Sequence, residues 1–182
     1  MSSRILKWAV GIFGALVFAC ATGVLSAVPA SASGLGTTCL GTATSEYVPG
    51  LTNDTATIHA SVEQHFFPCL GGPISGGSTA SGTSDTSCSD LTNPLEQVPT
   101  GGTISWSNGQ NSSYSGQATR EKVNADIVAV TRGQVTAGLF AGYHFLSQTT
   151  YPNVDLLACS DPEGIEELKG VVLLVISPLP IP

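Results

Sequence analysis

The segment 103–114 is the feature that most constrains the fold, because it has the pattern of a tight β-hairpin. Its Asn108-Gly109 pair tolerates the positive φ values that such a turn requires. Ile104 and Trp106 lie two residues apart, so both point to one face of the strand, and that face needs a cover. We favour a three-residue loop with a bulge at Gly109, which brings Tyr114 to the face of Ile104 and Trp106. A two-residue loop would turn Tyr114 away.

The rest of the chain also shows short alternating segments separated by turn residues. Residues 55–67 alternate best, with Ile58, Ala60 and Val62 on one face, which predicts a half-buried antiparallel strand. Residues 171–176 are apolar at every position and predict a central strand covered on both faces. Asp161-Pro162 has the composition of a helix start and Gly170 that of a helix end, which predicts a short helix between them.

These segments predict a single all-β domain over residues 33–182 with about 7–9 short strands. We favour an immunoglobulin-like antiparallel β-sandwich with one short helix near the C-terminus, and a barrel is the alternative. The Gly/Ser/Thr-rich segment 71–89 is expected to be a flexible loop, although 78–88 would also suit a polar edge strand. The Pro-rich tail 178–182 is expected to be extended.

Residues 1–32 have the pattern of a secretory signal peptide. Arg4 and Lys7 precede an apolar run over 8–28, and Ala30-Ser31-Ala32 supplies small residues for cleavage. We therefore predict cleavage after Ala32 and a secreted, extracellular protein. The alternative is an uncleaved membrane anchor, because about 20 apolar residues are enough to span a bilayer. Cys20 is a poor lipoprotein cysteine, since the bulky Phe18 precedes the small Ala19 in front of it.

The charge of the processed chain excludes two classes of partner. Cleavage after Ala32 leaves 150 residues that contain four basic and 13 acidic side chains, a formal net charge of −9. Such a chain is unsuited to nucleic acid and to anionic membrane surfaces. We expect no nucleic-acid partner and no membrane association after signal cleavage. A chain of this length can bury enough surface to fold as one self-sufficient domain.

Four cysteines follow the predicted cleavage point, namely Cys39, Cys69, Cys88 and Cys159. An even number in an exported chain predicts two disulfides, and no Cys-x-x-Cys spacing is present to indicate a redox or zinc site. Four cysteines allow three pairings, which sequence alone leaves open. We favour Cys39–Cys69, because pairing of the first two strands brings these residues together, and Cys88–Cys159 follows by elimination.

The histidines raise a metal hypothesis. His59, Glu63 and His65 share one face of the predicted strand 55–67, and His144 lies on another strand. They are ligand types for zinc or copper, but His59 and His65 lie about 20 Å apart along an ideal strand. We therefore favour a solvated polar face, with no metal and no cofactor. A calcium site without EF-hand spacing is a weaker alternative; its acidic residues are Asp161, Glu163, Glu166 and Glu167.

Several segments are similar in order and spacing to a group of uncharacterised small secreted proteins of actinobacteria. They are residues 47–51, the hairpin segment 104–110 followed by Ser112, residues 133–142, and Leu156-Leu157-Ala158-Cys159. The resemblance covers most of the chain after the leader and implies a secreted, disulfide-bonded β-protein. It implies no activity and no catalytic or binding residues.

The sequence carries no catalytic motif such as Gly-x-Ser-x-Gly. We expect a non-enzymatic structural or binding module of the cell surface or medium, for which a cell-wall component or an extracellular protein is the fitting partner. The first alternative is a small secreted metal-binding protein or enzyme that uses the His/Glu strand face. The second is a secreted protease inhibitor that presents the segment between Cys69 and Cys88.

Overall fold

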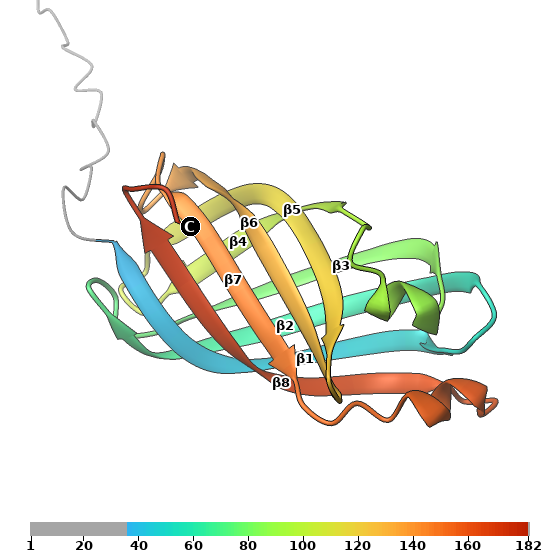
Figure 1. The fold of residues 1–182 in the computed structure, drawn as a ribbon. Helices are drawn as coiled ribbons and strands as arrows, with labels where there is room; N and C mark the ends of the chain where they lie inside the picture. Colours follow the sequence, from blue (N-terminus) through green and yellow to red (C-terminus); the bar gives the residue numbers. More distant parts are fainter. Residues whose placement is uncertain (1–35, 182) are drawn as a thin grey trace, which may run out of the picture.

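Eight antiparallel strands close into a barrel in the computed structural model, which describes residues 36–181 (Figure 1). Each strand pairs with the next one along the chain, and the last strand pairs with the first. The strands are β1 (Thr37–Leu51), β2 (Ala56–Leu70), β3 (Gly76–Thr86), β4 (Val98–Trp106), β5 (Asn111–Val123), β6 (Asp126–Gly138), β7 (His144–Tyr151) and β8 (Ile165–Ser177). Two short 3₁₀ segments, η1 (Cys88–Thr92) and η2 (Leu156–Ser160), lie near one end of the barrel.

The predicted immunoglobulin-like sandwich is wrong, because β1 and β8 pair with each other. Eleven residue pairs join these two strands, from Thr37 with Ile176 to Leu51 with Ile165. A sandwich has two sheets with free edges, whereas this pairing leaves one continuous sheet closed on itself. The alternation of buried and exposed residues is the same in both architectures, so it did not distinguish them.

The predicted helix near the C-terminus is also wrong, since residues 165–170 belong to β8 and residues 161–164 form no helix. Gly170 does not end a helix; it lies where β8 passes close to β7, and a Cβ there would be 2.4 Å from the carbonyl oxygen of Thr150. The apolar run that follows is not covered on both faces. Val172 faces the lumen and is buried, while Val171 on the outer face is 61% exposed.

The hairpin 103–114 has the predicted three-residue register. The N–H of Trp106 donates to the carbonyl oxygen of Gln110 at 2.9 Å, and Ser105 pairs with Asn111 in the ladder of β4 and β5. Gly109 has φ +80°, as the bulge requires. Tyr114 therefore lies on the lumen side with Trp106, which is buried as expected.

The lumen is filled at its two ends by two separate apolar clusters. The hairpin cluster comprises Cys39, Ala43, Phe66, Cys69, Ile104, Trp106, Val135, Phe140, Phe145, Val172, Leu174 and Ile176. The 3₁₀ cluster comprises Tyr47, Leu51, Ile58, Cys88, Leu91, Ile127, Tyr151, Cys159, Ile165 and Leu168. The side chains between the two clusters are smaller and more polar, and the candidate site lies among them.

Both disulfides have the favoured pairing. Cys39 and Cys69 face each other in the ladder of β1 and β2, and the register shifts just after Cys39, as a bulge there would produce. Cys88 and Cys159 tie η1 to η2. The turn between β1 and β2 joins this end through backbone hydrogen bonds, because Asn53 N–H donates to Cys159 and Cys88 N–H donates to Thr52. The 3₁₀ end of the barrel is thus cross-linked.

The segment 71–89 is largely ordered as β3, which pairs along its whole length with β2. This agrees with a polar strand rather than with the flexible loop, and the strand is unpaired on its β4 side only beyond Thr79. Residues 178–181 form no strand. The predicted signal peptide, residues 1–32, lies outside the described residues. Within residues 36–181, no helix is both long and apolar enough to cross a membrane.

Candidate functional site

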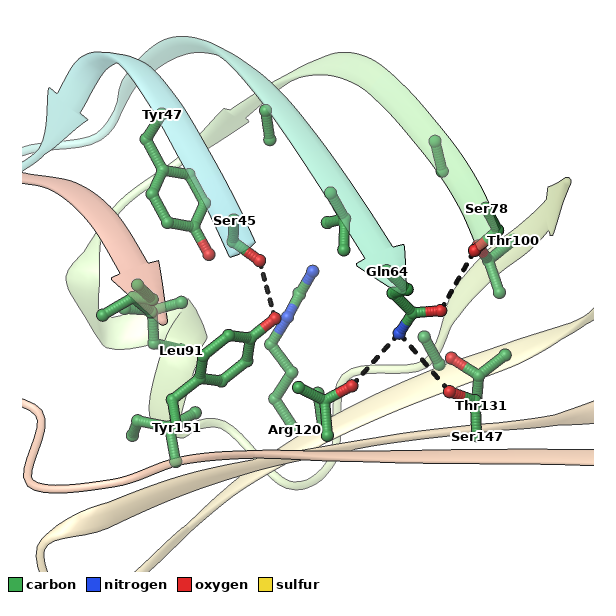
Figure 2. Close-up of a pocket in the computed structure, with 18 of the residues that line it drawn as sticks. Ser45, Tyr47, Gln64, Ser78, Leu91, Thr100, Arg120, Thr131, Ser147 and Tyr151 are labelled. Carbon is green, nitrogen blue, oxygen red and sulfur yellow. Dashed lines mark hydrogen bonds between the residues drawn. The ribbon is translucent and has the colours of Figure 1, made fainter. Parts of the chain in front are cut away.

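A cavity of about 130 Å³ lies inside the barrel between the hairpin cluster and the 3₁₀ cluster (Figure 2). It is lined by side chains from all eight strands and from η1: Ser45, Tyr47, Ala60, Val62, Gln64, Ser78, Ala80, Leu91, Thr100, Tyr114, Ala118, Arg120, Ile127, Ala129, Thr131, Phe145, Ser147, Thr149, Tyr151 and Leu168. The wall is mixed: eleven of these twenty side chains carry a polar group and nine are apolar. Sites for small molecules likewise combine apolar walls with polar groups in fixed positions.

The cavity exists because four strands present alanine to the lumen at this level. These are Ala60 on β2, Ala80 on β3, Ala118 on β5 and Ala129 on β6. The lumen of an eight-stranded barrel is just wide enough for larger side chains to fill it. Alanine at inward positions therefore leaves space, whereas the aromatic residues of the hairpin cluster close the lumen beyond it.

Gln64 on β2 reaches across the lumen and fixes the polar part of the wall (Figure 2). Its Nε2 donates to Thr149 Oγ1 at 3.2 Å and to Ser147 Oγ at 3.4 Å, both on β7. Its Oε1 accepts a hydrogen bond from Ser78 Oγ on β3 at 3.2 Å. These bonds use both donors and the acceptor of the amide, so Gln64 holds three strands together rather than presenting a free donor.

Two tyrosines and a serine form the second polar group, on the side of the 3₁₀ cluster. Ser45 Oγ and Tyr151 Oη are 2.6 Å apart. Burial raises the pKa of Tyr47 to about 12, and the neighbouring Tyr151 adds to this, while Arg120 and the hydrogen bond from Ser45 oppose it. Burial also raises the pKa of Tyr151. Both phenols therefore stay neutral at physiological pH and keep their O–H donors.

Arg120 on β5 is the one charged residue that lines the cavity, among the residues the structure describes. Its side chain points into the lumen between Tyr151 and Gln64 (Figure 2). It is half-buried, and no carboxylate within residues 36–181 forms an ion pair with it. Its positive charge lowers the pKa of both tyrosines, but the effect of burial on these pKa values is larger. A guanidinium held in a partly apolar lumen without a counter-charge favours an anion beside it.

The cavity borders the place where β3 and β4 separate. Only four residue pairs join these strands, from Gly76 to Thr79 on β3, against seven or more at each of the other seams. Beyond Thr79 the two strands diverge toward η1 (Figure 1). Ala80 from one edge and Thr100 from the other both line the cavity. This seam is therefore the part of the barrel wall with the fewest paired residues.

The residues of the metal hypothesis lie on the outer surface of the barrel and do not converge. His65 Nε2 contacts Glu63 Oε1 at 3.1 Å on the exposed face of β2, and His59 Nδ1 lies 3.2 Å from Thr83 Oγ1. His144 lies at the start of β7. Within residues 36–181, no three side chains of the His, Cys, Asp or Glu type are grouped closely enough to hold a metal ion.

The structure supports neither the calcium site at the acidic group nor an exposed inhibitor loop between Cys69 and Cys88. Glu166 and Glu167 of the acidic group lie exposed on β8, and Glu167 forms an ion pair of 2.7 Å with Lys169. The stretch between Cys69 and Cys88, which an inhibitor would have to present as a loop, is occupied mainly by β3.

Sequence reasoning did not single out Arg120, Gln64, Tyr47 or Tyr151. One signal was available for Arg120, because it shares strand parity with Tyr114 and so lies on the face that the hairpin assigns to the interior. Scans against models of known protein families, against curated proteins and against solved structures found no match to the chain. Inferences about function therefore depend on the geometry of the lumen.

Proposed function

We propose that this protein is a secreted binding module that holds a small organic ligand in the lumen of its barrel. The observation that carries the proposal is the cavity between the two apolar clusters, which combines an apolar wall formed largely by alanine with polar groups that hydrogen bonds hold in place. Concave, largely preformed sites with this mixture of surfaces are typical of ligand-binding proteins.

The cavity volume limits the ligand. An apolar cavity of about 150 Å³ is known to bind benzene, and one water molecule takes up about 30 Å³. A cavity of about 130 Å³ is slightly smaller than the benzene-binding one, so it suits a compact ligand not much larger than benzene, or a short hydrocarbon chain. A longer ligand would extend through the seam between β3 and β4, where Ala80 and Thr100 border the cavity.

Two observations support an extracellular location for this module. The two intramolecular disulfides are of the kind that persist in oxidising compartments. The leader pattern of residues 1–32 is typical of export.

The proposal is tested with cavity-filling variants of the protein purified with both disulfides formed. Ala118→Leu places three more carbon atoms in the cavity, and Ala137→Leu makes the same change at an exposed position of β6 as a matched control. A set of small aromatic and short-chain compounds is screened by ligand-observed NMR. We expect hits for the native protein and for Ala137→Leu, and their loss in Ala118→Leu.

Folding of each variant is checked by its near-ultraviolet circular dichroism and its melting temperature. Hits that survive in a folded Ala118→Leu variant would place binding outside the lumen. The absence of any hit with the native protein at millimolar concentration would also refute the proposal. Ala129→Leu, which fills the cavity from β6, gives a second variant if Ala118→Leu does not fold.

A further inference from the structure

From the polar groups of the cavity we infer, on the basis of the function proposed above, that its ligand is a small organic monocarboxylate. The carboxylate binds the guanidinium of Arg120 and the hydroxyl groups beside it. The compact apolar body of the ligand lies against the alanine and valine side chains of β2, β3 and β5.

The charge distribution of the chain makes Arg120 unusual. Only four basic residues follow the leader, and 13 acidic residues are available to pair with them. Lys169 pairs with Glu167 on the surface, while Lys122 is exposed. Arg120 alone points into the lumen, and none of the described acidic residues lines the cavity with it. In so acidic a chain, a cation that forms no ion pair with any described carboxylate is suited to an anion from outside.

The atoms around Arg120 are suited to a carboxylate in particular. Guanidinium presents a planar fork of donors that matches the two oxygens of a carboxylate. The Ser45–Tyr151 hydroxyl pair and the phenol of Tyr47 line the same cavity. Because burial keeps both phenols protonated, they can donate to an anion instead of repelling it. The site thus offers one full positive charge and several neutral donors, which matches a single negative charge.

The rest of the wall excludes a small inorganic anion as the best ligand. Val62, Ala80 and Ala118 face the cavity, and Tyr114 and Phe145 border it as a stacked pair with ring centroids 4.3 Å apart. Sulfate or phosphate would leave these apolar surfaces uncovered, and its second charge would have no partner. A carboxylate joined to a ring or a short hydrocarbon chain would cover both parts of the wall.

Benzoate and hexanoate are the probes, and benzamide and hexanamide are their neutral counterparts of matching shape. Binding to the protein with both disulfides formed is measured by isothermal titration calorimetry and by NMR. We expect each acid to bind about ten- to a hundredfold more tightly than its amide, the range expected for charge-assisted hydrogen bonds. Inorganic phosphate is expected to bind more weakly than either acid.

Arg120→Met removes the charge and keeps the length of the side chain. Lys122→Met makes the same change at an exposed position two residues along β5 and is the matched control. We expect Arg120→Met to bind the acids about as weakly as the amides, and Lys122→Met to behave like the native protein. If Arg120→Met does not fold, Arg120→Lys is used instead, because it retains the charge without the planar fork of donors. Its affinity for the acids should fall between the native protein's affinity for the acids and its affinity for the amides.

The outcomes separate the ligand class from the proposed function. If the amides bind as tightly as the acids, in a manner that Ala118→Leu abolishes, the lumen binds ligands but the carboxylate assignment is wrong. The same conclusion follows if phosphate binds as well as benzoate, or if Lys122→Met reduces affinity as much as Arg120→Met. If no probe binds and no other compound does, both the function and its ligand class are refuted.

Discussion

Gly76 lies directly opposite Trp106 in the ladder of β3 and β4, and the indole ring covers its Cα. A Cβ at this position would be 2.6 Å from Cε3 and 3.0 Å from Cζ3 of the indole. The ring is also held on its other sides. It makes an edge contact with Phe140 at a centroid distance of 5.9 Å, and its Nε1 donates to Ser112 Oγ at 2.8 Å. The indole therefore cannot move away easily when space is lost.

We predict that Gly76→Ala destabilises the protein by about 1–3 kcal/mol, the usual cost of overpacking a well-packed core. Gly82→Ala is the control on the same strand, because a Cβ there meets nothing within 4 Å. Thermal unfolding followed by circular dichroism should show a lower melting temperature for Gly76→Ala alone. Equal melting temperatures for the two variants would mean that the indole is free to rearrange.

Trp106→Ala should lower the free energy of unfolding by about 3–5 kcal/mol, as expected for truncation of a large buried aromatic side chain. Trp106 is only 4% exposed, whereas Phe67 on the outer face of β2 is 70% exposed. Phe67→Ala is therefore the control and should cost far less. Urea denaturation gives both values. A chain cleaved after Ala32 has Trp106 as its single tryptophan, so blue-shifted fluorescence of the native state provides an independent check of burial.

The hairpin and the first disulfide could be predicted because the signals that determine them are local. The register around Asn108-Gly109 depends on a few adjacent residues and on where Tyr114 must point. The Cys39–Cys69 pair followed from the pairing of two neighbouring strands. Short-range turn chemistry and strand parity were sufficient for both features.

Closure of the barrel could not be predicted in this way. It depends on the pairing of β1 with β8, whose residues are more than a hundred positions apart in the sequence. Inward and outward residues alternate in the same manner in a sandwich and in a barrel, so the parity of Ile58 or Val172 gives no information about closure. The helix expected over 161–170 was wrong for a related reason. Asp161, Pro162 and Gly170 have the chemistry of helix ends, but residues 165–170 are paired with β1 as part of β8.

The candidate site was hidden for a different physical reason. Ala60 was correctly assigned to the buried face. A single inward alanine does not predict a cavity, however, because the space forms only where neighbouring strands place other alanines beside it. The role of Arg120 also depends on residues of other strands. In a β-sandwich, a charged residue at its position would be read as solvated, and only the closed wall places it beside Tyr47 and Tyr151. The site is a product of closure, which is itself a non-local feature.

Removal of the Cys88–Cys159 disulfide should loosen one end of the barrel rather than the whole wall. The loop it closes spans 71 residues, so its loss is expected to cost about 4 kcal/mol in the chain-entropy model. In the double variant Cys88→Ala/Cys159→Ala, hydrogen exchange should accelerate at residues 52–54 and in η2. The double variant Cys39→Ala/Cys69→Ala is the comparison and should leave these amides protected. Uniform acceleration in both variants would contradict a local role for each bridge.

The stability of the protein should fall at alkaline pH because of Tyr47. This side chain ionises at its ordinary pKa of 10.0 in the unfolded chain, while burial raises its pKa to about 12 in the native barrel. Between these values the unfolded state has released a proton that the native state still holds, so rising pH favours unfolding. The contribution is complete below pH 10 and is lost as pH rises through 12; the gap corresponds to about 3 kcal/mol.

Urea denaturation measured at intervals from pH 8 to beyond the pKa of Tyr47 (roughly pH 12) tests this prediction. Tyr47→Phe cannot ionise and should lose less stability than the native protein over the same interval. Phe67→Tyr is the control, because a tyrosine at this exposed position ionises alike in both states and should leave the slope unchanged. Burial also raises the pKa of Tyr114 and Tyr151, and both remain in all three proteins. The difference between the native protein and Tyr47→Phe therefore reports Tyr47 together with its interaction with Tyr151. Parallel curves for the native protein and Tyr47→Phe would show that this phenol ionises in the folded barrel as readily as in the unfolded chain.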